Sequence, residues 1–190
     1  MSRTRLFLLQ GQLLGFLFLC PIALAQVPKP KPEHRIASIG CFMNVKGDGE
    51  HEYGYSAQLW FQGDRIIGFI YYHCGLIGDS PMGILTDVRY DAPTGKISFK
   101  AKLTSGLHSC RIHKNVPSHD LLSFNGFLKP DGLTGNIRIE DKLDSPPAVM
   151  DSRDSLVMLR SGSCLTQNYK SYNEWWRTWE PVYKVRGAKW

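Results

Sequence analysis

The densest group of side chains that could do chemistry lies between residues 108 and 120. His108, Cys110 and His113 stand close together, and His119 and Asp120 follow them. Imidazole nitrogens and cysteine sulfurs of this kind bind zinc. The spacings His-x-Cys and Cys-x2-His match no common zinc motif, so we interpret the stretch as a solvated loop. We predict no metal site and no cofactor.

Motifs for nucleophilic or acid–base catalysis are absent from the sequence. It contains no Gly-x-Ser-x-Gly, no His-Glu-x-x-His and no glycine-rich phosphate loop. His73 could approach the histidine-containing loop, and this keeps a hydrolase open as a third hypothesis. The sequence favours a protein without catalysis.

Aromatic side chains on one face of the expected strands are more informative. Strict alternation places Tyr53, Tyr55 and Phe61 on the same face of one strand. Neighbouring strands complete the set that we predict to bind a ligand: Tyr53, Tyr55, Phe61, Tyr72, Tyr90 and Phe99. A buried tyrosine hydroxyl needs a polar partner. We therefore expect a pocket for a small apolar or amphipathic molecule, with a filled core as the alternative.

The C-terminal tail combines aromatic and basic residues. Its aromatic side chains are Trp175, Trp176, Trp179, Tyr183 and Trp190. Their spacing predicts a helix over residues 168–179 that packs its aromatic side on the domain and stops at Pro181. If the tail is exposed instead, the alternative function is a protein-binding module, an inhibitor or an envelope assembly factor, that uses its loops and this tail. Its partner would then be an extracytoplasmic protein.

The elements that position these residues are short alternating segments separated by turn signals. We expect eight strands, over residues 38–45, 52–62, 65–74, 84–90, 96–104, 120–128, 133–140 and 154–160. They predict an all-β fold, an eight-stranded antiparallel up-and-down barrel with the C-terminal α-helix packed outside. The alternative is an immunoglobulin-like β-sandwich, because Cys41, Trp60 and Cys110 have suitable spacing. His108 stands where that fold has a tyrosine, which favours the barrel.

Residues near both ends of the expected barrel resemble lipocalin-like (calycin) barrels. Those proteins often begin with Gly-x-Trp and have an arginine near the end of the last strand that covers the tryptophan. Gly40, Cys41 and Phe42 stand at the first place, with phenylalanine instead of tryptophan, and Arg160 stands at the second. The resemblance implies a barrel that holds one small ligand.

The first 25 residues have the pattern of a signal peptide. Arg3 and Arg5 precede a mostly apolar stretch, and the sequence Ala-Leu-Ala ends at Ala25. A Pro/Lys-rich extended leader over residues 26–37 and one domain over residues 38–190 would follow. We therefore expect a secreted or periplasmic protein with no transmembrane segment after cleavage. The formal net charge of +6 falls to +4 when the two arginines are removed, too mild to indicate a nucleic-acid partner.

Four cysteines remain in the expected mature chain, which is an even number typical of disulfides in exported proteins. In an up-and-down barrel, the start of the first strand and the end of the eighth lie at the same end. The end of the third and the end of the fifth lie at the other. We therefore predict the disulfides Cys41–Cys164 and Cys74–Cys110.

Overall fold

The computed structural model describes residues 35–76, 80–103, 119–164, 167–188 and 190. The predicted signal peptide, most of the predicted leader, and His108, Cys110 and His113 lie outside these residues. The described part contains nine strands and one helix: β1 (Ile36–Met43), β2 (Lys46–Gly47), β3 (His51–Gln62), β4 (Arg65–Leu76), β5 (Met82–Asp91), β6 (Lys96–Lys102), β7 (Asp120–Leu128), β8 (Gly132–Asp141), β9 (Ala148–Ser161) and α1 (Tyr172–Arg186).

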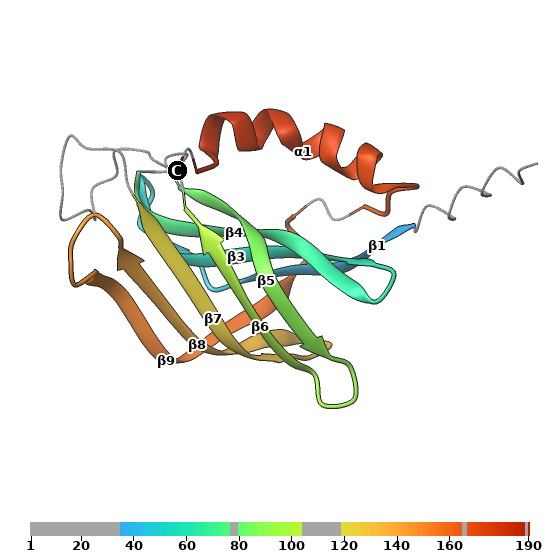
Figure 1. The fold of residues 1–190 in the computed structure, drawn as a ribbon, viewed down its shortest axis with the longest axis horizontal. Helices are drawn as coiled ribbons and strands as arrows, with labels where there is room; N and C mark the ends of the chain where they lie inside the picture. Colours follow the sequence, from blue (N-terminus) through green and yellow to red (C-terminus); the bar gives the residue numbers. More distant parts are fainter. Residues whose placement is uncertain (1–34, 77–79, 104–118, 165–166, 189) are drawn as a thin grey trace, which may run out of the picture. The chain divides into compact units, whose positions relative to one another are not determined.

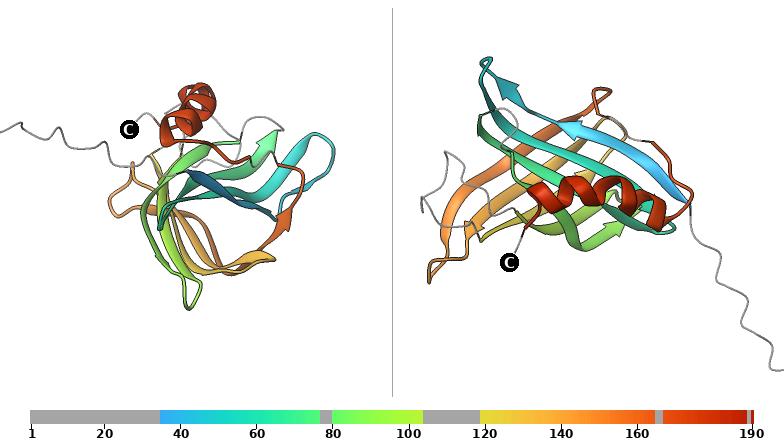
Figure 2. Two further views of the ribbon diagram at one scale, coloured as in Figure 1. Left: turned by 90° about the vertical axis from the view of Figure 1, so that its right-hand side faces the viewer. Right: turned by 90° about the horizontal axis from the view of Figure 1, so that it is seen from above.

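Eight of the strands close into an antiparallel barrel. From β3 to β9 each strand pairs with the next along the chain, and β1 pairs with both β3 and β9. Seen almost end-on, the strands form a ring (Figure 2). The two-residue strand β2 is an addition that pairs with the start of β3. The predicted up-and-down barrel is confirmed, and the immunoglobulin-like sandwich is wrong because one sheet closes on itself instead of packing against a second sheet.

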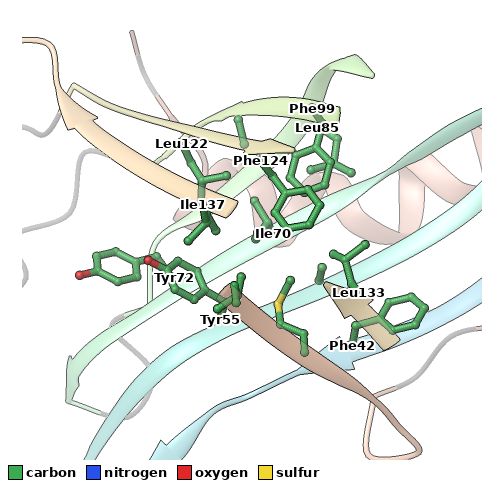
Figure 3. Packing of buried hydrophobic residues seen from close by; sticks show 14 of the residues in the cluster. Phe42, Tyr55, Ile70, Tyr72, Leu85, Phe99, Leu122, Phe124, Leu133 and Ile137 are labelled. Carbon is green, nitrogen blue, oxygen red and sulfur yellow. The ribbon is translucent and has the colours of Figure 1, made fainter. Parts of the chain in front are cut away.

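The barrel interior is filled by large apolar side chains. Alternation along β3 turns Tyr55, Ala57 and Leu59 inward, where all three are buried. Facing strands contribute buried phenylalanine, leucine and isoleucine side chains, several of which Figure 3 shows packed together. A barrel of eight strands is narrow enough for side chains to fill its middle.

One strand departs from simple alternation. Strict alternation over residues 84–90 would make Ile84 and Tyr90 of β5 face the same way. The register between β5 and β6 shifts between Thr86 and Arg89, and Asp87 adopts a positive φ of 51°. This bulge reverses the alternation, so that Ile84 packs in the cluster outside the barrel whereas Tyr90 packs against the interior.

The first and last strands are joined by a disulfide and by an arginine. Cys41 of β1 is bonded to Cys164, which follows β9, as predicted. The guanidinium of Arg160 lies 5.2 Å from the centre of the Phe42 ring, and its Nη1 donates to the Ile39 carbonyl at 2.7 Å. Gly40 has a φ of 145°, and a Cβ there would stand 2.4 Å from Arg160 Nη1. The glycine therefore makes room for the arginine.

The helix begins and ends later than predicted. Ser171 caps its first turn by accepting a hydrogen bond from the Glu174 N–H at 3.2 Å. Instead of stopping at Pro181, α1 continues to Arg186, and the Gly187 N–H donates to the Tyr183 carbonyl at 2.7 Å. The missing N–H of a proline costs one helical hydrogen bond. Packing of Val182 and Tyr183 against the barrel-side cluster favours the longer helix.

The helix covers the outer face of β3, β4 and β5 (Figures 1 and 2). Trp175 is 1% exposed, and its ring stacks on Phe69 of β4 at 5.2 Å and meets Trp60 of β3 edge-on at 5.8 Å. The predicted packing of the tail aromatics on the barrel is thus confirmed. Within the described residues, α1 lacks the length and apolarity that a membrane-spanning helix requires.

Candidate functional site

The barrel wall opens along part of β9. Strand β1 pairs with β9 only from Cys41 to Met43, opposite Leu159 to Ser161. Strand β9 begins much earlier, at Ala148. Among the described residues, no strand pairs with β9 on this side before Leu159. Its backbone groups there form an open edge, and we call the region between this edge and the start of β3 the seam.

Asn44 turns the chain away from β9 after β1 ends. Its N–H donates to the Tyr55 carbonyl at 3.0 Å, and its side-chain Oδ1 accepts from the Tyr55 N–H at 2.8 Å. Gly54, with a φ of 126°, leaves the space for this side chain, since a Cβ there would lie 2.9 Å from Asn44 Oδ1. The pair therefore joins the Asn44 segment to β3 and leaves the edge of β9 at the seam without a strand partner among the described residues.

A cavity of about 730 Å³ lies at the seam. Residues of β2, β3, β4 and β9, together with Asn44, form its wall: Asn44, Lys46, Tyr53, Gly54, Tyr55, Tyr72, His73, Cys74, Asp151, Ser152, Arg153, Asp154, Ser155, Leu156 and Val157. This volume is within the range of small-molecule sites. The wall combines aromatic rings with both acidic and basic groups.

Two tyrosines and an aspartate link the sides of the seam. The rings of Tyr55 and Tyr72 stack at 5.3 Å, and they lie together at one end of the packed side chains in Figure 3. The Tyr55 hydroxyl donates to Asp151 Oδ2 at 2.7 Å, and Arg153 Nε donates to Asp151 Oδ1 at 3.0 Å. Asp151 therefore receives hydrogen bonds from β3 and from its own strand.

Burial keeps both tyrosine hydroxyls protonated. Loss of hydration is the main reason that the pKa of Tyr72 rises to about 12, and the Asp151 charge adds to it. The pKa of Tyr55 is raised further by burial and by its hydrogen bond to Asp151. Because neutral hydroxyls can donate as well as accept, the cavity wall offers hydrogen-bonding groups beside aromatic surface.

The six predicted ligand-binding residues do not form one site. Tyr53, which is half exposed, lines the seam cavity together with Tyr55 and Tyr72. Phe61 lies farther along β3, where its ring contacts Tyr90 at 5.9 Å. Phe99 is 1% exposed and stacks on Phe124 at 4.9 Å. Three of the six therefore share the cavity, and the other three pack with the core.

Sequence analysis missed the β9 side of the cavity. We expected the last strand to begin at Asp154, which placed Asp151 and Arg153 in a loop. The run Ala148-Val149-Met150 was the available signal for an earlier start. Two register shifts between β8 and β9, near Ile137 and Glu140, disturb the alternation there, so a period of two was not visible.

His119 and Asp120 are the residues of the histidine-containing stretch that the structure describes, and neither lines the seam cavity. The His119 ring lies 5.1 Å from the Trp190 ring, and Asp120 is buried. The described residues hold no group of three or more potential metal ligands. Cys74 is disulfide-bonded, and the predicted partner Cys110 lies outside the described residues. His73 contacts Glu52, Ser56 and Ser80.

The architecture places the protein among closed eight-stranded antiparallel barrels with an outer helix, lipocalin-like in strand number and order. Searches against protein-family models, curated proteins and solved structures found no match to this chain. Function must therefore be argued from the chemistry of the site, because a fold alone does not define it.

Proposed function

We propose that the protein binds a small amphipathic molecule in the seam cavity. The observation that carries this proposal is a cavity of about 730 Å³ on whose wall tyrosines meet an acidic and a basic residue. Tyr55, Tyr72 and Leu156 supply surface for the apolar part of a ligand. Asp151 and Arg153 lie where its polar group would be bound. A purely apolar molecule would cover these charged groups without replacing the hydrogen bonds that they make to water.

The geometry where β1 pairs with β9 supports a lipocalin-type carrier. Arg160 covers the ring of Phe42, and Gly40 makes room for its guanidinium. These are the positions on which the resemblance to lipocalin-like barrels rests, and such barrels hold small ligands. The disulfide Cys41–Cys164 supports secretion or a periplasmic location, since disulfides persist in oxidising compartments.

A blocked cavity tests the proposal. Ser155 is exposed and lines the cavity, so Ser155→Trp should obstruct it without changing the core. We expect fluorescence titration with 1-anilinonaphthalene-8-sulfonate, an aromatic sulfonate, to show saturable binding that weakens at least about tenfold in this variant, or about 1.4 kcal/mol. Thr178→Trp, on the exposed side of α1, is the matched control and should bind like the wild type.

Equal binding by both variants would show that the probe sits elsewhere and would count against the seam. Native mass spectrometry of protein purified from its own source then identifies a natural ligand. A retained small molecule that Ser155→Trp no longer carries would establish the proposed function. A copurified protein in its place would favour the alternative below.

The open edge of β9 favours one second candidate, a protein-binding module. An extended peptide can add to an exposed strand edge through main-chain hydrogen bonds. Among the described residues, the edge of β9 that faces away from β8 has no strand partner before Leu159. A photo-crosslinking residue at position 155 should then capture a partner segment, whereas the same residue at position 178 should not. The aromatic tail, which packs on the barrel, is no longer the surface that this candidate uses.

A further inference from the structure

Three polar side chains form a hydrogen-bonded row on the outer face of β3 and β4. Gly54 of β3 lies opposite His73 of β4. Since Gly54 has no side chain, the imidazole lies between Glu52 and Ser56, the residues two positions away on either side. Ser56 Oγ is 2.8 Å from His73 Nε2, and Glu52 Oε2 is 3.0 Å from His73 Nδ1.

The carboxylate determines which ring nitrogen carries the proton. An ionised carboxylate can only accept hydrogen bonds, so Glu52 favours the tautomer with the proton on Nδ1. Nε2 is then an unprotonated acceptor for the Ser56 hydroxyl. Ser80 Oγ also lies 3.0 Å from Nδ1, the nitrogen that faces Glu52. Of the two serines on this histidine, only Ser56 contacts the nitrogen that can act as a base.

Burial and charge around the ring suit a general base. Ser56 is 7% exposed, and the side chains of His73 and Glu52 are 14% and 30% exposed. Loss of hydration lowers the pKa of His73, outweighing the opposite effect of Glu52, so the ring is neutral at pH 7. The positive charge of Arg186 acts on both His73 and Tyr71. This charge adds to the lowering of the His73 pKa.

We propose that Ser56, His73 and Glu52 form a nucleophilic site that reacts with esters. Ser56 Oγ attacks the ester carbonyl carbon while its proton passes to His73 Nε2. The bond to the leaving alcohol then breaks, and the alcohol takes that proton. Water, deprotonated by His73 Nε2, then attacks the acyl carbon bound to Ser56. The bond from this carbon to Ser56 Oγ breaks, the carboxylic acid leaves, and His73 returns the proton to Ser56 Oγ. The order of contacts, nucleophile to Nε2 and carboxylate to Nδ1, is the one that serine hydrolases use. The proposal does not rest on ligand binding at the seam.

A fluorophosphonate carrying a fluorophore tests the site without knowledge of a substrate. The reagent forms a bond to an activated serine oxygen and loses fluoride. We expect the wild-type chain to be labelled at Ser56, as mapped by proteolysis and mass spectrometry. Ser98, an outward-facing serine on β6, reports the background. Labelling of Ser56 no faster than that of Ser98, or labelling of Ser80 instead, would overturn the proposal.

Variants separate a nucleophilic site from a structural hydrogen-bond cluster. Ser56→Ala should abolish labelling, and His73→Gln should slow it by about 100-fold, the lower range for a general base. Glu52→Gln should slow it by about tenfold, less than loss of the base itself. Ser98→Ala, on β6, is the matched control, and its Ser56 should be labelled at the wild-type rate. Equal rates for wild type and His73→Gln, with both proteins folded by circular dichroism, would show a purely structural cluster.

The pH dependence of labelling supplies an independent readout. Protonation of His73 occupies the Nε2 lone pair, so the labelling rate should fall as the solution becomes acidic. Because the pKa of His73 lies below the ordinary value near 6.5, the rate should still be at its plateau at pH 7. Arg186→Gln removes a positive charge that lowers the pKa of His73, so the fall in rate should begin at a higher pH in this variant. A rate that does not fall on acidification would contradict a histidine base.

Discussion

A single hydroxyl group joins the two sides of the seam. Tyr55 is 2% exposed, and its hydroxyl reaches Asp151 across the cavity at 2.7 Å. Asp151 retains Arg153 as a second donor. The tyrosine therefore both stabilises the barrel and supplies the group with which a ligand would compete for Asp151.

Tyr55→Phe tests the stabilising role. Loss of a hydrogen bond to a charged group costs about 1.5–3 kcal/mol, and we expect the free energy of unfolding in urea to fall by about that amount. Tyr53→Phe, on a half-exposed ring, is the control and should change stability little. Equal effects would show that the Asp151 bond contributes nothing.

The same pair of variants gives a pH dependence. The pKa of Tyr55 is raised in the folded protein, so its contribution is complete below the unfolded value near 10 and is lost as the pH rises above it. The stability advantage of wild type over Tyr55→Phe should therefore shrink above about pH 10. An advantage that stays constant to pH 11 would contradict the raised pKa.

At the scale of elements, α1 is a cover for the outer face of the barrel. Its residue Trp175 is buried between Phe69 and Trp60, whereas the neighbouring Trp176 is only partly buried. Other large hydrophobic residues of the helix remain exposed, including Tyr172 and Val185. The packing of the helix on the barrel therefore depends more on Trp175 than on the number of aromatic residues in the helix.

Trp175→Ala should destabilise the protein strongly. Replacing a buried tryptophan by alanine costs about 3–5 kcal/mol, enough to lower the melting temperature by many degrees. Trp176→Ala is the matched control, and it should cost clearly less. Comparable melting temperatures for the two variants would mean that the helix does not pack on the barrel through Trp175.

At the scale of the whole molecule, closure depends on β1, which pairs with both β3 and β9. Its contact with β9 is short, and the disulfide Cys41–Cys164 joins the same two ends of the barrel. The bond closes a sequence separation of 123 residues, and such a cross-link removes much conformational freedom from the unfolded chain.

Removal of this disulfide should lower stability without changing the strand order. The double variant Cys41→Ala/Cys164→Ala should lose about 2–4 kcal/mol of unfolding free energy, the typical contribution of a native disulfide. Urea unfolding monitored by tryptophan fluorescence measures the loss, and reduced wild-type protein provides a comparison. An unchanged unfolding midpoint would show that pairing between β1 and β9 alone keeps the barrel closed.

The sequence by itself determined the strands, their order and one disulfide. Alternation along residues such as Tyr55, Ala57 and Leu59 predicts which face is buried, because a strand with one buried face repeats every two residues. Turn signals between strands indicated a meander, and a closed meander brings Cys41 and Cys164 to one end. These inferences needed only local pattern and connectivity.

Only the tertiary structure decided where the candidate sites lie. The early start of β9 and the register shifts between β8 and β9 interrupt the period of two, so alternation could not place Asp151 beside Tyr55. Likewise, His73 meets Ser56 and Glu52 because of the register between β3 and β4. The two-residue turn between Gln62 and Arg65 sets this register. The spacing of the three side chains in the sequence carries no motif, and their contacts depend on how the side chains pack in the folded barrel.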